Sequence, residues 1–425
     1  MNEPGRARRV VITGMGVITA LGSDLDSFWD GLLAGRSGIG PITHFDASRL
    51  ACRIAGEVTA FDPEDFMPSK EARRMSRCSQ MGMAASMLAA ADAGLATPLA
   101  NSEEVGVYVG TAVGGVDRLD EGIQNFRSNG AGRVNPFSAP SVLPNMPAFH
   151  ITHQFGALGP NSTITTACAA GTQVIGEAAD VIRARRANVI IAGGTESVIT
   201  DFAIAAFLAM RALPTGFNDD PQHASRPFDS RREGFVLSEG AAFLILEDYE
   251  HACARGAPHM YAEVAGFASS SDAYHVAAPD PTAGGAIRTM KWALQSAELE
   301  PHQVDYINAH GTGTPANDAV ETLAIKRTFS EHAYDIPISS TKSMLGHPLG
   351  ASGAIEAVAC ALTIQRGMIH PTTNHELPDP ECDLDYVPGR PREADVKIAL
   401  SNSFGLGGQN ACLVLKRVDD GCSSH

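Results

Sequence analysis

The chain has few aromatic and few charged residues, 6% and 19% of 425. It also lacks long runs of like charge, and 44% of its residues are hydrophobic, so disordered and low-complexity classes are excluded. No stretch of about 20 residues is apolar enough to span a bilayer. Basic residues are outnumbered, since 32 Lys and Arg against 48 Asp and Glu give a net charge of −16. This charge disfavours nucleic acid and membrane surfaces as partners and, taken alone, an acidic protein partner as well.

The eight cysteines form no Cys-x-x-Cys pair and show no metal-like spacing with histidine. The spacing favours free thiols in a reducing compartment, and it predicts neither disulfides nor a bound metal. An N-terminal apolar stretch after Arg9 is interrupted by Gly14 and Gly16 and lacks a cleavage site. We therefore expect a first strand there and a cytoplasmic protein.

Short β-branched runs alternate with Ala-rich helical stretches, which predicts an α/β fold with buried sheets. A weak internal repeat is present, because residues 163–194 and 336–400 share the order strand, polar turn, helix, strand. A chance match of pattern is the alternative. Two related halves joined near residues 250–262 would explain why so long a chain has no linker. The proline-containing segment 128–149 is expected to form loops that cover a site or build an interface.

Cys168 lies where a β-prone run ends and an Ala-rich helix begins. Free N–H groups and the helix dipole at such a position favour a thiolate nucleophile, and the same amides could bind an oxyanion. The alternative is a small buried core residue.

His310 and His347 each follow a predicted strand, where open α/β sheets place their ligand sites. Alone, each is more often a structural histidine, but together with Cys168 they form a Cys-His-His set suited to proton transfer and to stabilising an enolate. Lys342 and Glu356 flank the second histidine, either as an ion pair that orders its loop or as an unrelated surface lysine and helix glutamate.

The segment 401–410 is a glycine-rich turn after a strand. It satisfies neither the Walker nor the dinucleotide fingerprint. Either a mobile loop that donates an N–H to a substrate carbonyl or an ordinary hairpin fits this pattern. Separately, residues 70–77 carry four basic side chains and one acidic side chain, a local +3 that is either a solvated helix face or a docking patch.

These motifs resemble the β-ketoacyl-acyl carrier protein synthases, and among them the type II group of bacterial and plastid fatty-acid synthesis. The resemblance runs from about Arg9 to Lys416 and rests on seven motifs in order. They are VVITGMG (10–16), TTACAAG (165–171), AGGTES (192–197), RPFDSRREGFVLSEG (226–240), NAHGTGT (308–314), KSMLGHPLGASG (342–353) and NSFGLGGQN (402–410).

The resemblance implies a thiolase fold in which two similar halves, residues 1–258 and 259–425, form five α/β layers, usually in a homodimer. It implies a decarboxylative Claisen condensation. Cys168 takes an acyl group from acyl carrier protein, malonyl carrier protein then loses CO₂, and the carbanion attacks the thioester to give a 3-oxoacyl product. No cofactor is implied, because the phosphopantetheine arm belongs to the carrier protein.

The resemblance also assigns roles to individual residues. His310 and His347 would stabilise the enolate, with Lys342 and Glu356 as their supporting pair. The N–H groups of Cys168 and Leu406 would form the oxyanion hole, within a gate that includes Phe404 and Gly405. Thr312 and Thr314 would bind the pantetheine arm, and Val113 and Phe235 would line the acyl pocket. The carrier protein would dock on Lys70, Arg73, Arg74, Arg133 and Arg211.

Two positions depart from the family pattern. Leucine stands at 406, where phenylalanine normally closes the acyl pocket, and valine stands at 113, a position often held by isoleucine. We expect a slightly roomier channel that accepts medium to long acyl chains.

The same motifs distinguish this family from most related classes. A biosynthetic thiolase and a type III synthase lack this two-histidine pattern, and an inactive chain-length factor typically lacks the cysteine. The ketosynthase subunit of a discrete (type II) polyketide system would share nearly every motif and stays open.

Overall fold

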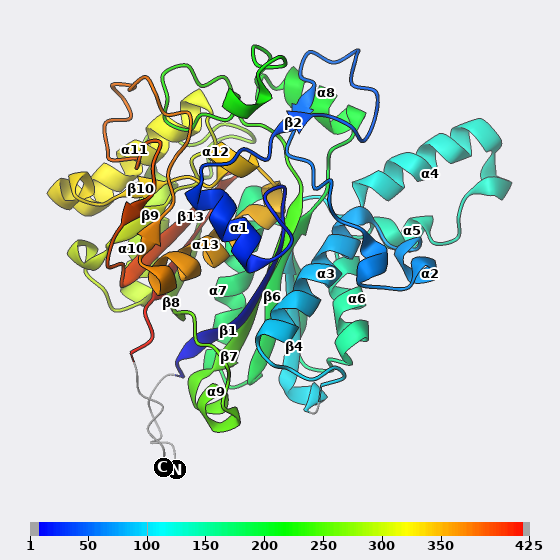
Figure 1. Cartoon of the computed structure of the whole chain (residues 1–425), viewed down its shortest axis with the longest axis horizontal. Helices are drawn as coiled ribbons and strands as arrows, with labels where there is room; N and C mark the ends of the chain where they lie inside the picture. Colours follow the sequence, from blue (N-terminus) through cyan, green and yellow to red (C-terminus); the bar gives the residue numbers. More distant parts are fainter. Residues whose placement is uncertain (1–7, 100, 420–425) are drawn as a thin grey trace.

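Ten strands form one continuous sheet with two equivalent halves in the computed structural model, which describes residues 8–99 and 101–419 (Figure 1). The strand order is β5-β4-β6-β7-β1-β8-β14-β13-β9-β10. The first half contains β1 (Val10–Ile18), β4 (Val105–Gly110), β5 (Asn161–Ile164), β6 (Val189–Glu196) and β7 (Gly240–Asp248). The second contains β8 (Glu263–Ser271), β9 (Tyr306–Asn308), β10 (Ile338–Ser339), β13 (Ile398–Gly405) and β14 (Gln409–Lys416). Strands β1 and β8 join the halves through the single pair Val11 and Glu263.

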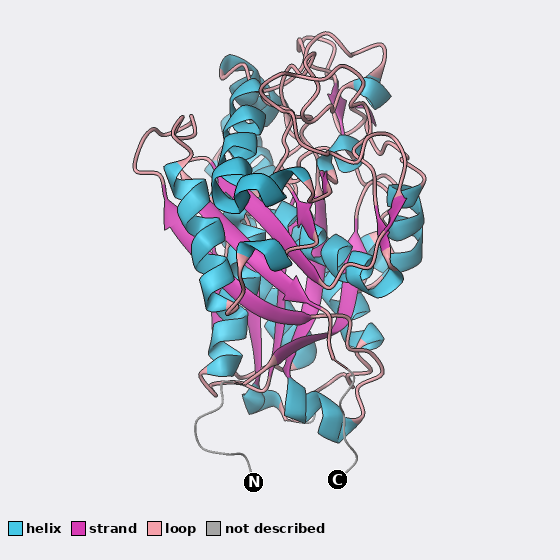
Figure 2. Ribbon diagram, turned by 90° about the vertical axis from the view of Figure 1, so that its left-hand side faces the viewer, coloured by secondary structure: helices cyan, strands magenta, loops and turns pink. Residues whose placement is uncertain are grey.

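Helices lie in three layers around and between the two half-sheets (Figure 2). The central helices α7 (Ala170–Arg183) and α13 (Ser352–Arg366) contact each other and strands of both halves. Helices α3 (Arg77–Asp92) and α6 (Met146–Phe155) cover the first half, and α10 (Gly284–Ser296) with α11 (Pro315–Phe329) cover the second. The five-layered α/β fold class predicted from the sequence is therefore confirmed.

The internal repeat corresponds to real structure, because β5-α7-β6 and β10-α13-β13 occupy equivalent places in the two halves. The central helices meet closely at their N-terminal ends. A Cβ on Gly353 would lie 2.1 Å from Thr172 Oγ1, and one on Gly171 would lie 2.8 Å from the Ala354 nitrogen. Only glycine permits this approach. The domain boundary at residues 258 and 259 stays a prediction.

Segment 128–149 differs from the expected loops, because it is largely helical. It contains the end of α4 (Val116–Asn129), then α5 (Ser138–Val142) and the start of α6. Its prolines fit because they lie in or near the first turns of α5 and α6, where a missing N–H costs nothing. Helix α4 extends away from the body in Figure 1, and none of its residues is buried.

Shorter elements complete the chain outside these layers. They are α1 (Leu25–Leu33), α2 (Ser69–Ala72), α8 (Asp201–Ala209), α9 (Tyr249–Arg255), α12 (Lys342–Leu345) and the paired short strands β2 (Gly40–Pro41) with β3 (Ile54–Ala55) and β11 (Met368–Ile369) with β12 (Arg392–Glu393). Among the described residues, no helix has the length and apolar character needed to cross a membrane.

The cysteines correct one expectation. In the described part of the chain, six of them are free and buried, and Cys253 on α9 is disulfide-bonded. The cysteine spacing does not predict this bond.

Candidate active site

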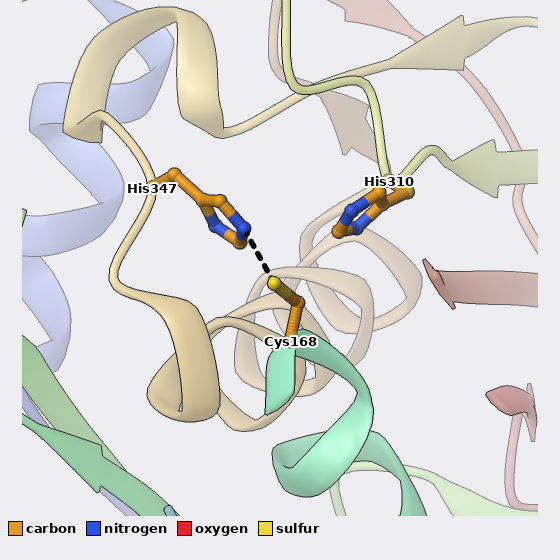
Figure 3. A group of neighbouring side chains, drawn as sticks. All are labelled: Cys168, His310 and His347. Atoms are coloured by element: carbon orange, nitrogen blue, oxygen red, sulfur yellow. Dashed lines mark hydrogen bonds between the residues drawn. The ribbon is translucent and has the colours of Figure 1, made fainter. Parts of the chain in front are cut away.

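Cys168, His310 and His347 converge from three separate segments (Figure 3). Cys168 lies in a 3-10 turn, Ala167–Ala169, directly before α7; His310 follows β9, and His347 follows α12. The His347 Nε2 atom lies 3.0 Å from Cys168 Sγ, and the two imidazole centroids are 5.4 Å apart. All three side chains are buried, so the predicted Cys-His-His set is one site drawn from both halves.

The backbone at Cys168 turns sharply between strand and helix. Ala167 has a φ of +49°, a left-handed conformation that alanine rarely adopts and that surrounding structure must hold. The glycine-rich turn approaches from β13, and a Cβ on Gly405 would lie 3.3 Å from the Cys168 nitrogen. The backbone N–H of Leu406 acts to lower the pKa of the Cys168 thiol. The segment is thus both a β13-β14 hairpin and an N–H donor to the site.

The protonation state of Cys168 differs from the expected thiolate. Burial raises the pKa of the thiol to about 11, although the Lys342 charge and the Leu406 N–H act in the opposite direction. The helix dipole is outweighed by desolvation, because Cys168 is almost wholly removed from water. The group is therefore a neutral thiol near pH 7.

Burial also lowers the pKa of His310 and of His347 well below the ordinary value, and the nearby Lys342 charge adds to this effect. Both rings are neutral near pH 7. The Nδ1 atom of His347 lies 2.9 Å from Ser352 Oγ. When Nδ1–H donates to Ser352, Nε2 is left to accept the thiol proton of Cys168.

His310 is held through its backbone rather than through its ring. The N–H groups of His310 and Gly311 each donate to the Glu321 carboxylate at 2.8 Å, and Lys342 Nζ donates to the His310 carbonyl at 2.7 Å. The ring packs edge-on against Phe404 at 5.7 Å. Its Nδ1 is buried without a hydrogen-bond partner among the described residues, and the residue lines the cavity.

Lys342 and Glu356 form a buried ion pair behind the histidines, each with 1% of its side chain exposed. Burial raises the pKa of Glu356, and the Lys342 charge opposes that rise. Neither residue lines the cavity. Their geometry suits positioning, since Lys342 holds the backbone of His310.

A cavity of about 410 Å³ opens above Cys168 and the two histidines. Seven further predicted residues line it, namely Arg211, Phe235, Thr312, Thr314, Phe404, Gly405 and Leu406. The hydroxyls of Thr312 and Thr314 lie 3.0 Å apart, and the Phe235 ring is 5.3 Å from His347.

Val113 does not line this cavity, and 46% of its surface is exposed. Its N–H donates to Glu196, which fixes its position, but the single chain leaves about half of its surface uncovered. Sequence reasoning missed Phe207 and the loop residues Asp272 and His275, which do line the cavity. No local signal marks them, because they come from an apolar helix and from an irregular loop.

The predicted docking residues Lys70, Arg73, Arg74 and Arg133 are exposed and lie outside the cavity, whereas Arg211 is exposed at its lining. Arg77, the fourth basic residue of segment 70–77, is not free. It binds the buried Glu239 carboxylate at 2.8 Å. The exposed charge of this segment is therefore +3 from Lys70, Arg73 and Arg74 and −1 from Glu71, a sum of +2.

Known proteins are similar to this chain along most of its length. Residues 7–252 match the Beta-ketoacyl synthase, N-terminal domain, and residues 261–376 match the Beta-ketoacyl synthase, C-terminal domain. A relative from Synechocystis sp., named 3-oxoacyl-acyl-carrier-protein synthase 2, is 50% identical over 96% of this chain and 98% of its own length.

Two solved structures are also similar. A beta-ketoacyl synthase from Burkholderia phymatum is 38% identical, with a TM-score of 0.89 over 97% of this chain and all of that one. A type II polyketide ketosynthase solved with its acyl-carrier protein is 34% identical, with a TM-score of 0.90 and the same coverage. The chain belongs to the β-ketoacyl synthase family.

Proposed function

We propose that the chain is the condensing enzyme of fatty-acid elongation, a β-ketoacyl-acyl carrier protein synthase. It joins malonyl carrier protein to a cysteine-bound acyl group and gives 3-oxoacyl carrier protein and CO₂. The observation that carries this proposal is the 3.0 Å contact between the Cys168 thiol and a neutral His347, with His310 facing the same cavity. The relative named 3-oxoacyl-acyl-carrier-protein synthase 2 supports the fatty-acid pathway.

In the first half-reaction Cys168 Sγ attacks the thioester carbonyl of the acyl carrier protein as its proton moves to His347 Nε2. The N–H groups of Cys168 and Leu406 stabilise the oxyanion of the tetrahedral intermediate. The carbon–sulfur bond to the pantetheine arm then breaks, and the departing thiolate takes the proton back from His347. The acyl group is left as a thioester on Cys168, and His347 is neutral again.

In the second half-reaction the malonyl group loses CO₂, and the electron pair of the broken bond forms an enolate. In this step His347 carries its proton on Nε2, while Nδ1 accepts from the Ser352 hydroxyl. Hydrogen bonds from His310 and His347 then stabilise the enolate oxygen, so no base has to remove a carbon-bound proton. The enolate carbon attacks the Cys168 thioester, the carbon–sulfur bond breaks, and the departing thiolate takes a proton from solvent to restore the thiol. Lys342 and Glu356 are positioning residues in this scheme. The carrier protein brings the pantetheine arm, so the enzyme needs neither cofactor nor metal of its own.

The proposed partner is acyl carrier protein, and Thr312 and Thr314 would receive its arm through their hydroxyls along the cavity. The complex of a similar ketosynthase with its acyl-carrier protein supports this partner. Because fatty-acid elongation uses a diffusing carrier protein, we also place the enzyme in the cytoplasm.

A homodimer is part of the proposal. Exposed apolar side chains gather on and beside α4 and α5, including Phe126 at 53% and Phe137 at 41% exposure. Strand β5 is a free sheet edge, which proteins usually cover. A second copy on this face would also cover Val113 and could complete its role in the acyl pocket. Replacing Phe126 and Phe137 by glutamate should yield monomers in sedimentation velocity; a wild-type monomer would contradict the dimer.

Mass spectrometry of the intact protein after incubation with acyl carrier protein tests the nucleophile. Wild type should gain one acyl mass, and Cys168→Ala should gain none. Cys78→Ala, which removes another buried thiol, is the matched control and should acylate normally. Acylation of the Cys168→Ala variant would refute the mechanism. Separate loss of malonyl decarboxylation in His310→Ala and in His347→Ala would support the enolate roles.

A polyketide ketosynthase is the second candidate, because one similar structure is the ketosynthase of a type II polyketide system. Repeated incubation with malonyl carrier protein alone distinguishes the two. An elongation enzyme should stop after one condensation unless the 3-oxo group is reduced, whereas a polyketide ketosynthase with its partner should accumulate unreduced chains.

A further inference from the structure

Glu196 is a buried carboxylate beside the site that the mechanism above does not use. It ends β6 and is fully buried. It accepts hydrogen bonds from the N–H groups of Ala112, Val113 and Gly114 and from the Thr111 hydroxyl. The carboxylate thus fixes the conformation of loop 111–114, which belongs to the first half of the molecule.

The same carboxylate also reaches the second half. Its Oε2 atom accepts the Gly350 N–H at 3.2 Å. Gly350 lies between His347 and Ser352, whose hydroxyl contacts His347 Nδ1. One side chain of the first half therefore holds the loop that carries both the imidazole and the group that orients it.

The backbone segments in this contact region pack closely, without room for an added side-chain atom. A Cβ on Gly350 would lie 2.3 Å from the Ala112 nitrogen and 2.6 Å from Glu196 Oε2, and one on Gly194 would lie 2.7 Å from the Gly350 oxygen. Leu349 has a φ of +39°, which surrounding contacts must maintain. Glu196 Oε2 is the acceptor that is hydrogen-bonded to the loop at this point.

We propose that Glu196 is a positioning residue which, by holding the Gly350 N–H, sets the separation of His347 Nε2 from Cys168 Sγ. The inference deepens the proposed function, on which its meaning for catalysis rests. A carboxylate suits the task because both oxygens accept several N–H groups, whereas glutamine offers one oxygen and points an NH₂ group at donors.

Alkylation of Cys168 by iodoacetamide, followed on its own peptide by mass spectrometry, measures the thiol–imidazole alignment without carrier protein. Glu196→Gln should slow this alkylation about 10- to 100-fold, because small misplacements of a reacting pair cost that much. In a His347→Ala background the same change should cause no slowing. Equal slowing in both backgrounds would show that Glu196 does not act through His347 and would overturn the proposal.

Glu247→Gln is the matched control, because Glu247 is also a fully buried carboxylate and lies at the far end of the same strand pair. Residue 247 pairs with Val189 of β6, and Glu196 pairs with Gly240 of β7. Its alkylation rate should equal that of wild type. Since the assay needs no acyl substrate, failure of the condensing function would leave these rates unchanged.

Gly350→Ala tests the same contact without changing Glu196. It can be measured in place of Glu196→Gln if that variant does not fold. The added Cβ should push the loop from the carboxylate and slow alkylation only when His347 is present. Gly40→Ala, which places a Cβ in open space, is its control. Unchanged alkylation in Gly350→Ala would contradict the proposal.

Discussion

At the scale of single residues, the site is governed by desolvation. Cys168 and His347 are both neutral because burial disfavours their charged forms, so the proton stays on sulfur until substrate arrives. A resting thiolate would need a cation in contact, and Lys342 is instead paired with Glu356. The enzyme would therefore form its nucleophile during attack, through the 3.0 Å contact with Nε2.

The pH dependence of Cys168 alkylation follows from this state. With a thiol pKa of about 11, the thiolate fraction grows with pH throughout the neutral range. In His347→Ala, where no imidazole accepts the proton, the alkylation rate should rise about tenfold per unit between pH 7 and pH 10, as expected for a reaction of the free thiolate. With His347 present the rate should change little over this range, because the neutral imidazole takes the thiol proton during attack. Iodoacetamide kinetics on the Cys168 peptide measure both profiles, and a flat profile in His347→Ala would contradict the raised thiol pKa.

Breaking the buried Lys342–Glu356 pair should destabilise the fold. Lys342→Met leaves Glu356 buried without its partner, which costs about 3–5 kcal/mol in comparable cases. The double variant Lys342→Met, Glu356→Gln should lose less, because no uncompensated charge remains. Urea unfolding measures both.

The control is Lys397→Met, whose partner Asp395 is about two-thirds exposed. It should change the free energy of unfolding by less than about 1 kcal/mol. Similar losses for Lys342→Met and Lys397→Met would show that burial does not govern the first pair.

At the scale of elements, the central helices determine how the two halves fit. Gly176 of α7 faces β8, and a Cβ there would lie 2.0 Å from the Phe267 ring. Gly176→Ala should therefore destabilise the protein by about 1–3 kcal/mol through overpacking, despite the better helix propensity of alanine. Adding Phe267→Leu should recover part of the loss.

Gly122→Ala is the control for this change, since it is also a mid-helix glycine but has only ordinary contacts near the added Cβ. It should be neutral or stabilise the protein by up to about 1 kcal/mol. Thermal unfolding compares the variants. A stable Gly176→Ala protein would mean that α7 and β8 can separate freely.

The same elements explain how much could be predicted. The strand-end positions of Cys168, His310 and His347 follow from hydrophobic runs and small-residue turns, which are local signals. The protonation of Cys168 could not be predicted, because its burial arises only when loops of both halves close over it. Likewise Arg77 looked free within its basic segment, although the buried Glu239 that binds it lies 162 residues away. An ion pair between residues far apart in the chain cannot be predicted from the local sequence pattern.

At the scale of the whole molecule, the net charge of −16 and an acidic carrier protein are compatible only if attraction is local. Lys70, Arg73 and Arg74 are exposed together on and directly after α2, and Arg74 also stacks on Phe137 at 4.6 Å. The negative remainder of the surface would repel the carrier protein from other faces. The position of the basic side chains therefore matters more for docking than the total charge of the protein.

Reversing Arg73 and Arg74 to glutamate should raise the KM for acyl carrier protein about tenfold or more at low salt, and added salt should shrink the difference. Reaction with small pantetheine thioesters should be unaffected, because the cavity is unchanged. Arg185→Glu with Arg186→Glu at the exposed end of α7 is the matched control, since both pairs change the net charge by −4, from −16 to −20. If the control raises KM equally, total charge and not the α2 surface governs docking; if small thioesters lose activity as well, the α2 variant has damaged the site itself.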